Sequence, residues 1–265
     1  MTSAVLSGMK GLDTSAVEVD DDQAPPTILA NSPEERSALA EMDALLPPEV
    51  LAASPEAQRL MCLRGRKYSP TRAAVLLPKM LAMLSSLELD PANPGPKLLS
   101  DLKSLKVVNL PSHDTSGRGL IWLRLRNHRP SLSTPEDFAR CVAFVVLRLL
   151  SSDPEVQRRG VTVVNDLSGL SISNLQPSAA KLVFSLVFPS LPVRVGRVCV
   201  FNPPFIVGSI ILPVMLRLVS SKLRKRVRVL SSDPIDLEPY VLEAQRPREL
   251  GGSMPFDEEG WAAGL

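Results

Sequence analysis

The chain has 265 residues, which is enough for one domain with a sizeable core and a small additional lobe. Its 30 Lys and Arg nearly balance 28 Asp and Glu, so overall charge gives no reason to expect a nucleic-acid partner. Three cysteines, Cys62, Cys141 and Cys199, lie far apart without a CxxC pair, and the two histidines are His113 and His128. These residues argue against a disulfide framework, a metal site and imidazole-based catalysis. We expect no cofactor and a reduced, cytoplasmic setting.

Charge is unevenly placed along the chain. The first fifty residues contain the acidic run 20–22. By contrast, the segment 217–228 contains no acid and six basic residues, namely Arg217, Lys222, Arg224, Lys225, Arg226 and Arg228. This asymmetry predicts an anionic partner for the late segment.

The sequence predicts neither a secretory signal nor a membrane-spanning helix. The first thirty residues lack a basic start followed by an apolar run. The longest apolar stretch, 198–219, is interrupted by the Asn-Pro-Pro of 202–204 and by Pro213. A spanning helix needs about 20 mostly apolar residues without such breaks.

Composition and periodicity divide the chain into four parts. Residues 1–31 mix Gly, Ser, Pro and acids, which predicts a disordered tail. Residues 32–105 show helical patterns, several of which open with Pro, and we predict a helical lobe there. The main domain is expected over 106–255, followed by a tail over 256–265.

The main domain alternates between strand and helix patterns. We predict strands at 119–126, 161–164, 193–201 and 227–230, and helices that start at Thr134 and cover 176–187 and 205–219. This order predicts an α/β fold with right-handed crossovers and a mainly parallel sheet. No strand is followed by a glycine-rich phosphate loop, so the pattern does not favour dinucleotide binding.

Five separate stretches resemble, in the same order, motifs of the CRAL-TRIO lipid-binding family. They are RLMCLRGRKY at 59–68, HDTSGR at 113–118, GVTVVNDLSG at 160–169, LPVR at 191–194 with NPP at 202–204, and RPRELGG at 246–252. Gly119 and Leu191 replace the Pro and the aromatic residue that are usual in the family. The resemblance covers about residues 55–255. It implies a sheet that forms the floor of an apolar cavity, and a gate helix after the Asn-Pro-Pro turn that closes over one lipid.

The candidates for the cavity wall are apolar residues of the predicted strands and helices, although each residue of this kind is more often ordinary core than ligand contact. They are Phe138, Cys141, Val145, Val161, Val163, Ile172, Leu175, Val183, Leu186, Val187 and Val198. The candidate gate residues are Phe205, Ile206, Ile210, Ile211, Leu212 and Met215. A helix that is apolar on every side must be buried in protein or face lipid, and both interpretations remain open.

The resemblance also implies a phosphoinositide-binding patch beside the gate. Its residues, matched to the family by motif, would be Arg66, Arg194, Lys222 and Arg226. An alternative interpretation is an ordinary solvated helix end, because cations there complement the helix dipole.

We therefore expect a non-enzymatic, monomeric protein that binds one hydrophobic lipid and transfers it between phosphoinositide-containing membranes, with which it associates reversibly. An alternative is an adaptor for membranes or small GTPases that keeps the fold and carries no lipid. A hydrolase would need Asp166, which ends a predicted buried strand, but no nucleophile and base motif accompanies it. We interpret Asp166 as a turn-capping residue.

Overall fold

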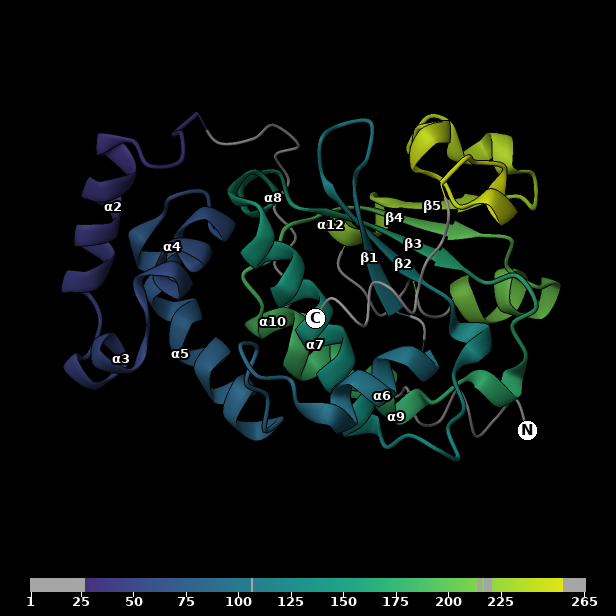
Figure 1. Cartoon of the computed structure of the whole chain (residues 1–265), viewed down its shortest axis with the longest axis horizontal. Coiled ribbons are helices and arrows are strands. Elements are labelled where there is room, and N and C mark those ends of the chain that lie inside the picture. The colour runs from purple at the N-terminus through teal and green to yellow at the C-terminus, as the bar shows by residue number, and fades with distance from the viewer. Residues whose placement is uncertain (1–26, 106, 214–215, 217–220, 255–265) are drawn as a thin grey trace.

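The computed structural model describes residues 27–105, 107–213, 216 and 221–254. Its first part is a helical lobe. The lobe consists of α2 (Pro33–Ala44), α3 (Pro48–Ala53), α4 (Glu56–Gly65) and α5 (Pro70–Ser86), and α6 (Gly95–Leu105) connects it to the sheet domain. Figure 1 shows the lobe on the left and the sheet on the right. The predicted helical N-terminal region is thus confirmed as part of the fold.

Buried Arg64 joins two helices of the lobe to each other and the lobe to the sheet domain. The Arg64 guanidinium of α4 makes two hydrogen bonds to the Glu35 carboxylate of α2, with Nε–Oε1 and Nη2–Oε2 distances of 2.7 and 2.8 Å. Arg64 Nη1 also donates to Gln157 Oε1 at 2.9 Å, in α8 (Pro154–Arg159). Two parallel bonds to one carboxylate fix both the distance and the orientation of α2 and α4. The oriented guanidinium then links the lobe to α8 through Gln157.

The sheet has five strands in the order β1 to β5. They are β1 (Val107–His113), β2 (Gly119–Leu123), β3 (Val161–Asp166), β4 (Val195–Phe201) and β5 (Val227–Leu230). β1 pairs antiparallel with β2, and the other three pairings are parallel. The predicted α/β fold with a mainly parallel sheet is confirmed. β1 was not predicted, and β2 is shorter than the predicted strand 119–126, because Leu125–Asn127 form a 3-10 turn, η1.

The crossover segments supply the helices on one face of the sheet. α7 (Pro135–Ser152) and α8 lead from β2 to β3. Between β3 and β4 come η2 (Ile172–Asn174), α9 (Pro177–Leu182), the π-helical turn η3 (Val183–Val187) and α10 (Phe188–Ser190). Between β4 and β5 come a second π-helical turn, η4 (Val207–Ile211), and α12 (Ser221–Arg224).

The C-terminal segment covers the opposite face of the sheet. It contains three short 3-10 turns, η5 (Pro234–Leu237), η6 (Glu243–Gln245) and η7 (Arg248–Leu250), drawn in yellow in Figure 1. Alternate strand residues point to this side and pack against the C-terminal segment. Together they form a core cluster, whose buried members are Leu120, Trp122, Val164, Cys199, Phe201, Leu230, Leu237, Val241 and Leu250. We call this face of the sheet, which is covered by that cluster of buried side chains, the closed face. We call the opposite side the cavity face.

Residues 27–31 correct part of the prediction of a disordered tail. Ile28 packs against the core, and its carbonyl oxygen accepts a hydrogen bond from Arg158 Nε at 3.0 Å. A backbone carbonyl that accepts from a buried guanidinium gives this short stretch a fixed place. The rest of the predicted tails, 1–26 and 256–265, lies outside the described residues. Within the described residues, no helix combines the length and the hydropathy needed to span a bilayer.

Candidate functional site

A cavity of about 320 Å³ lies on the cavity face of the sheet. Its floor is formed by the strand residues that alternate with those of the closed face, among them Ile121, Val163, Val198 and Val200. Helices α7 and α9, the turn η3 and the segment around η4 supply the other walls. Among the described lining residues, no side chain is an acid, a Lys or an Arg, and four are polar: His128, Asn165, Asn174 and Gln176. The cavity is therefore suited to an apolar guest.

The structure places seven of the eleven predicted wall residues on the cavity wall. They are Phe138, Val145, Val161, Val163, Leu175, Val183 and Val198. The other four do not line it. Cys141 and Val187 are fully buried in the core, Leu186 is half-buried against that core, and Ile172 is 38% exposed on η2.

The error on α7 is one of helix phase. Val142 and Val146 line the cavity together with Phe138 and Val145. With 100° of rotation per residue, Cys141 lies on the far side of Phe138 from Val142. It therefore points into the packed core, where burial raises the pKa of its thiol. The apolar stripe of α7 is wider than the cavity, and only its centre faces the open space.

The predicted gate segment has an inner and an outer side. Val207 and Ile211 are buried, and together with Leu212 and Leu216 they line the cavity. On the outer side, Phe205 is 81% exposed, and Ile206 and Ile210 are also exposed. The sixth candidate, Met215, lies outside the described residues. The segment after the Asn-Pro-Pro turn thus covers the cavity with one side and presents apolar side chains to solvent with the other.

Two of the predicted phosphate-binding residues, Arg194 and Arg226, directly precede β4 and β5. The backbone of Gly65, next to Arg66, lies so close to Pro192 that a Cβ there would overlap the Pro192 carbonyl. The Arg194 carbonyl accepts from Val161 N at 2.7 Å at the start of β3.

The two arginines of the loops before β4 and β5 are not exposed. Arg194 and Arg226 are 5% and 7% exposed. Arg194 Nη1 donates to the Arg158 carbonyl, and Arg226 Nη1 donates to the Val195 carbonyl at 2.6 Å. Guanidinium groups that are buried and bind backbone carbonyls hold the chain together, and the phosphate-binding roles of Arg194 and Arg226 stay predictions. The Lys222 side chain lies outside the described part of the chain, and the phosphate-binding roles of Arg66 and Lys222 stay predictions.

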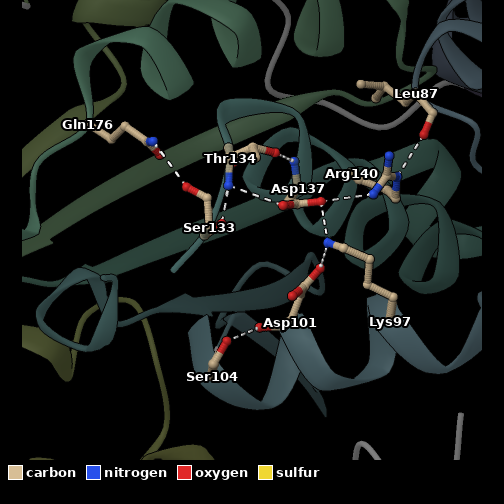
Figure 2. A network of polar contacts seen from close by, with 9 residues as sticks. All are labelled: Leu87, Lys97, Asp101, Ser104, Ser133, Thr134, Asp137, Arg140 and Gln176. Carbon is tan, nitrogen blue, oxygen red and sulfur yellow. Dashed lines mark hydrogen bonds and ion pairs between the residues drawn. The ribbon is translucent and has the colours of Figure 1, made fainter. Parts of the chain in front are cut away.

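A polar network holds the start of α7 against the helical lobe (Figure 2). Asp137 Oδ1 lies 2.5 Å from Lys97 Nζ of α6 and 3.0 Å from Arg140 Nη1. Arg140 Nε in turn donates to the Leu87 carbonyl at 2.7 Å. Thr134 and Asp137 also form a reciprocal cap, in which each backbone N–H donates to the other side chain at 3.1 Å.

These contacts determine the charge state of Asp137. Burial is the largest single influence and raises the pKa, but the hydrogen bonds from Lys97 and Thr134 outweigh it and bring the pKa of Asp137 to about 2. The carboxylate is therefore ionised at neutral pH, and it anchors the helix that forms one wall of the cavity.

The same network positions a polar residue on the cavity wall. Gln176 Nε2 donates to the carbonyl of Ser133, the residue before the Thr134 cap, at 3.2 Å (Figure 2). Nearby in sequence, the Asn174 carbonyl lies 2.9 Å from His128 Nδ1, and the His128 ring packs edge-on against Phe138 with 5.0 Å between centroids. Neither His128 nor Gln176 was predicted as a site residue, because a single histidine or glutamine forms no recognisable motif.

Asp166, the residue that a hydrolase would need, has structural partners. Its carboxylate is 1% exposed and accepts from Arg126 Nη1 at 2.6 Å. It also accepts from the backbone N–H of Ser168 at 3.0 Å, which is a turn-capping contact. The interpretation as a capping residue therefore agrees with the geometry.

The fold and the cavity together define the class: an α/β domain built around an apolar cavity in front of a mainly parallel sheet. The model of the CRAL/TRIO domain family matches residues 103–252, more than half of the chain, so this chain belongs to the CRAL/TRIO family. The match contains all strands from β2 to β5 and every crossover between them.

Two curated relatives share moderate identity with the chain. Clavesin-1 of Rattus norvegicus is 29% identical over 160 residues, which cover 59% of this chain and 45% of the relative. Alpha-tocopherol transfer protein-like of Mus musculus is 28% identical over 211 residues, which cover 78% of this chain and 61% of the relative. The chain thus spans about half the length of these relatives.

One solved structure supports the fold alone. The crystal structure of Sfh5 superposes with a TM-score of 0.54 at 13% identity, and the alignment covers 87% of this chain and 91% of that one. Because this alignment extends beyond the matched domain, the helical lobe also has a counterpart in that structure.

Proposed function

We propose that this protein binds one hydrophobic lipid in the cavity and transfers it between membranes as a monomer. The observation that carries the proposal is the cavity of about 320 Å³ with no charged side chain among its described lining residues. Each 100 Å² of apolar ligand surface that leaves water contributes roughly 2–3 kcal/mol. One relative is named for the transfer of α-tocopherol, and membership of a lipid-binding family supports the same activity.

Blocking the cavity should remove the lipid. We expect Val163→Phe to fill the space above β3, because the Val163 side chain lies on the cavity floor. Val229→Phe is the matched control, since Val229 is 53% exposed on β5 and does not line the cavity. The proteins are purified from eukaryotic cells, and their lipids are extracted and quantified by mass spectrometry.

The expected result is about one lipid per chain in the wild type and in Val229→Phe, and at least tenfold less in Val163→Phe. A wild-type protein that yields no lipid under the same conditions would favour the adaptor alternative. Equal lipid content in all three proteins would place the lipid somewhere other than in this cavity.

For membrane contact, we propose that the gate segment moves outward and inserts its apolar side chains into the bilayer. Phe205 and Ile210 already expose apolar surface on the outer side of the cavity cover. Opening would expose the inner residues Val207 and Ile211 as well, which water disfavours and a bilayer does not. Opening is therefore coupled to contact with a membrane, and the lipid stays sealed while the protein is in the cytoplasm.

Variants that place acidic side chains on the outer side of the gate segment test this mode of membrane docking. The double variant Phe205→Asp with Ile210→Asp should lower lipid transfer between phosphatidylcholine vesicles at least fivefold. The matched control is Ile235→Asp with Leu242→Asp, which adds the same charge at two exposed apolar positions of the segment over the closed face. Equal transfer rates for both double variants would contradict a gate at this place.

We propose further that basic residues beside the gate bind phosphoinositide headgroups. Arg224 at the end of α12 and Lys225 after it are exposed, whereas Arg194 and Arg226 are buried. Each basic residue near an anionic membrane contributes about 1 kcal/mol, and salt screens that attraction. Vesicle sedimentation with and without phosphatidylinositol phosphate should show weaker, less salt-dependent binding for Arg224→Gln with Lys225→Gln. The control Arg36→Gln with Lys181→Gln, at two exposed cations elsewhere, should bind like the wild type.

A further inference from the structure

The apolar cavity has one polar region on its wall. His128 follows the turn η1 after β2, and Gln176 lies just before α9, so two separate crossover segments meet there. The two segments are joined by the bond between His128 and the Asn174 backbone. They are also joined by the bond between Gln176 and Ser133, which Figure 2 shows. The polar region is therefore built into the wall by contacts that fix each side chain in place.

The hydrogen bond of His128 determines which of its ring nitrogens can accept. Its Nδ1 lies 2.9 Å from the carbonyl oxygen of Asn174, which can only accept, so Nδ1 carries the proton. Burial lowers the pKa of His128, so the ring is neutral at physiological pH and Nε2 is an acceptor. The residue is 2% exposed, and Nε2 has no hydrogen-bond partner within the described chain.

The Gln176 side chain supplies a second buried acceptor without a partner among the described residues. Its Nε2 donates to the Ser133 carbonyl, and this bond fixes the orientation of the amide. Its Oε1 is buried and likewise has no partner among the residues that the structure describes. An unsatisfied buried acceptor costs about 1–3 kcal/mol, so two of them in an otherwise apolar cavity strongly favour a guest that donates. By contrast, the Asn174 amide is satisfied, because its Nδ2 donates to two backbone carbonyls and its Oδ1 accepts from Ser171 N.

We infer that the cargo is a lipid alcohol, whose hydroxyl donates a hydrogen bond to His128 Nε2 and whose apolar body fills the rest of the cavity. This inference rests on the proposed lipid-binding function. A lone hydroxyl donates to one acceptor at a time, mainly to His128 Nε2 and otherwise to Gln176 Oε1. Esters, ethers and aldehydes have no donor, so they leave both acceptors unpaired. Asn165, the remaining polar group on the wall, offers both a donor and an acceptor and does not discriminate.

A matched pair of probes tests the inference without any mutation. Dissociation constants of tritiated oleyl alcohol and oleyl methyl ether are measured by equilibrium dialysis against the wild-type protein. The two probes share one chain and differ in the O–H group. We expect the alcohol to bind at least tenfold more tightly than the ether, because a site with unpaired acceptors rejects an analogue that lacks the donor.

Two variants test whether His128 and Gln176 cause the preference for the alcohol over the ether. In His128→Asn the side-chain amide can still donate to the Asn174 carbonyl, as Nδ1 does, and the Nε2 acceptor is lost. In Gln176→Met the side chain keeps its length and loses the Oε1 acceptor. We expect His128→Asn to weaken binding of the alcohol at least fivefold and to leave the affinity for the ether within twofold. Gln176→Met should reduce the same preference by a smaller factor.

The outcomes separate this inference from the function on which it rests. Tight binding of both probes with equal affinity to the wild type would overturn the inference and leave lipid binding intact. An alcohol preference that persists unchanged in both variants would overturn the assignment to His128 and Gln176. Failure of both probes to bind, together with an empty lipid extract from cells, would reject the proposed function itself and the inference with it.

Discussion

The two faces of the sheet are built from the same strands and pack in opposite ways. On the closed face, Trp122, Val164 and Phe201 are at most 2% exposed and fill the space up to the C-terminal segment. On the cavity face, Val163 and Val198 leave a space of about 320 Å³ in front of α7, α9 and η4.

Side-chain size explains the difference. The closed face contains a Trp, a Phe and several Leu, whereas the floor of the cavity consists mostly of valines. Protein interiors are normally packed as densely as organic crystals, so a space of this size needs rigid walls around it. The cavity therefore depends on which residues alternate along the strands as well as on the fold.

The largest effect is expected where the closed face loses its biggest side chain. Trp122→Ala should lower the free energy of unfolding by about 3–5 kcal/mol, because the ring is fully buried and its neighbours can relax only in part. Urea unfolding followed by circular dichroism measures the change. Val163→Ala on the cavity face is the control, and it should cost far less because its methyl groups border open space. Equal losses for both variants would contradict the difference between the faces.

A phenyl ring added at either of two neighbouring positions of β3 tests the difference in packing between the two faces. Val163 and Val164 are neighbours in sequence and point to opposite faces. Val164→Phe should cost about 1–3 kcal/mol through overpacking, whereas Val163→Phe has room for its ring and should cost less. Thermal unfolding of lipid-free protein compares them. A larger loss for Val163→Phe would mean that the cavity face is packed as tightly as the closed face.

Acid should weaken the wall of the cavity through Asp137. The folded-state pKa of about 2 lies below the ordinary value of 3.8, so the carboxylate stabilises the fold at neutral pH. That stability, about 2 kcal/mol, is fully present above about pH 5 and is lost as pH falls through 4 towards 2. Unfolding curves at several pH values test this, and Asp137→Asn should flatten the dependence in that window. Asp236→Asn removes an exposed carboxylate whose pKa is also lowered, by hydrogen bonds from Ser231, and it should flatten the dependence less than Asp137→Asn does.

The smallest effect on stability is expected on the outer side of the gate. Phe205→Ser should change the free energy of unfolding by no more than about 0.5 kcal/mol, because the side chain is 81% exposed. The same variant should bind vesicles more weakly, as sedimentation would show. A large loss of stability would instead identify Phe205 as part of the core.

Much of the fold could be predicted from sequence because local patterns determine it. The β-branched run 161–164 predicts a strand buried on both faces, and Thr134 followed by Pro135 predicts the start of α7. β1 was missed because Pro111 lies within it, and a Pro argues against a central strand. It is tolerated there because β1 is an edge strand with β2 as its sole neighbour in the sheet.

The cavity was predicted less well, since core and cavity wall use the same residue types. The spacing of Phe138 and Val145 indicated the correct face of α7, but it could not separate Cys141 in the core from Val142 on the wall. Charge clusters were similarly ambiguous. The run that contains Arg226 suggested an exposed patch, whereas its guanidinium is buried against a strand carbonyl, a tertiary contact that local sequence does not reveal.

The most direct test of the central claim is a crystal structure of the protein purified from cells together with its native lipid. The account predicts electron density for one lipid between Val163 of β3 and Ile211 of η4, with a hydroxyl within hydrogen-bond distance of His128 Nε2. A structure in which side chains from η3 and η4 close onto the sheet and leave no space for a lipid would contradict it.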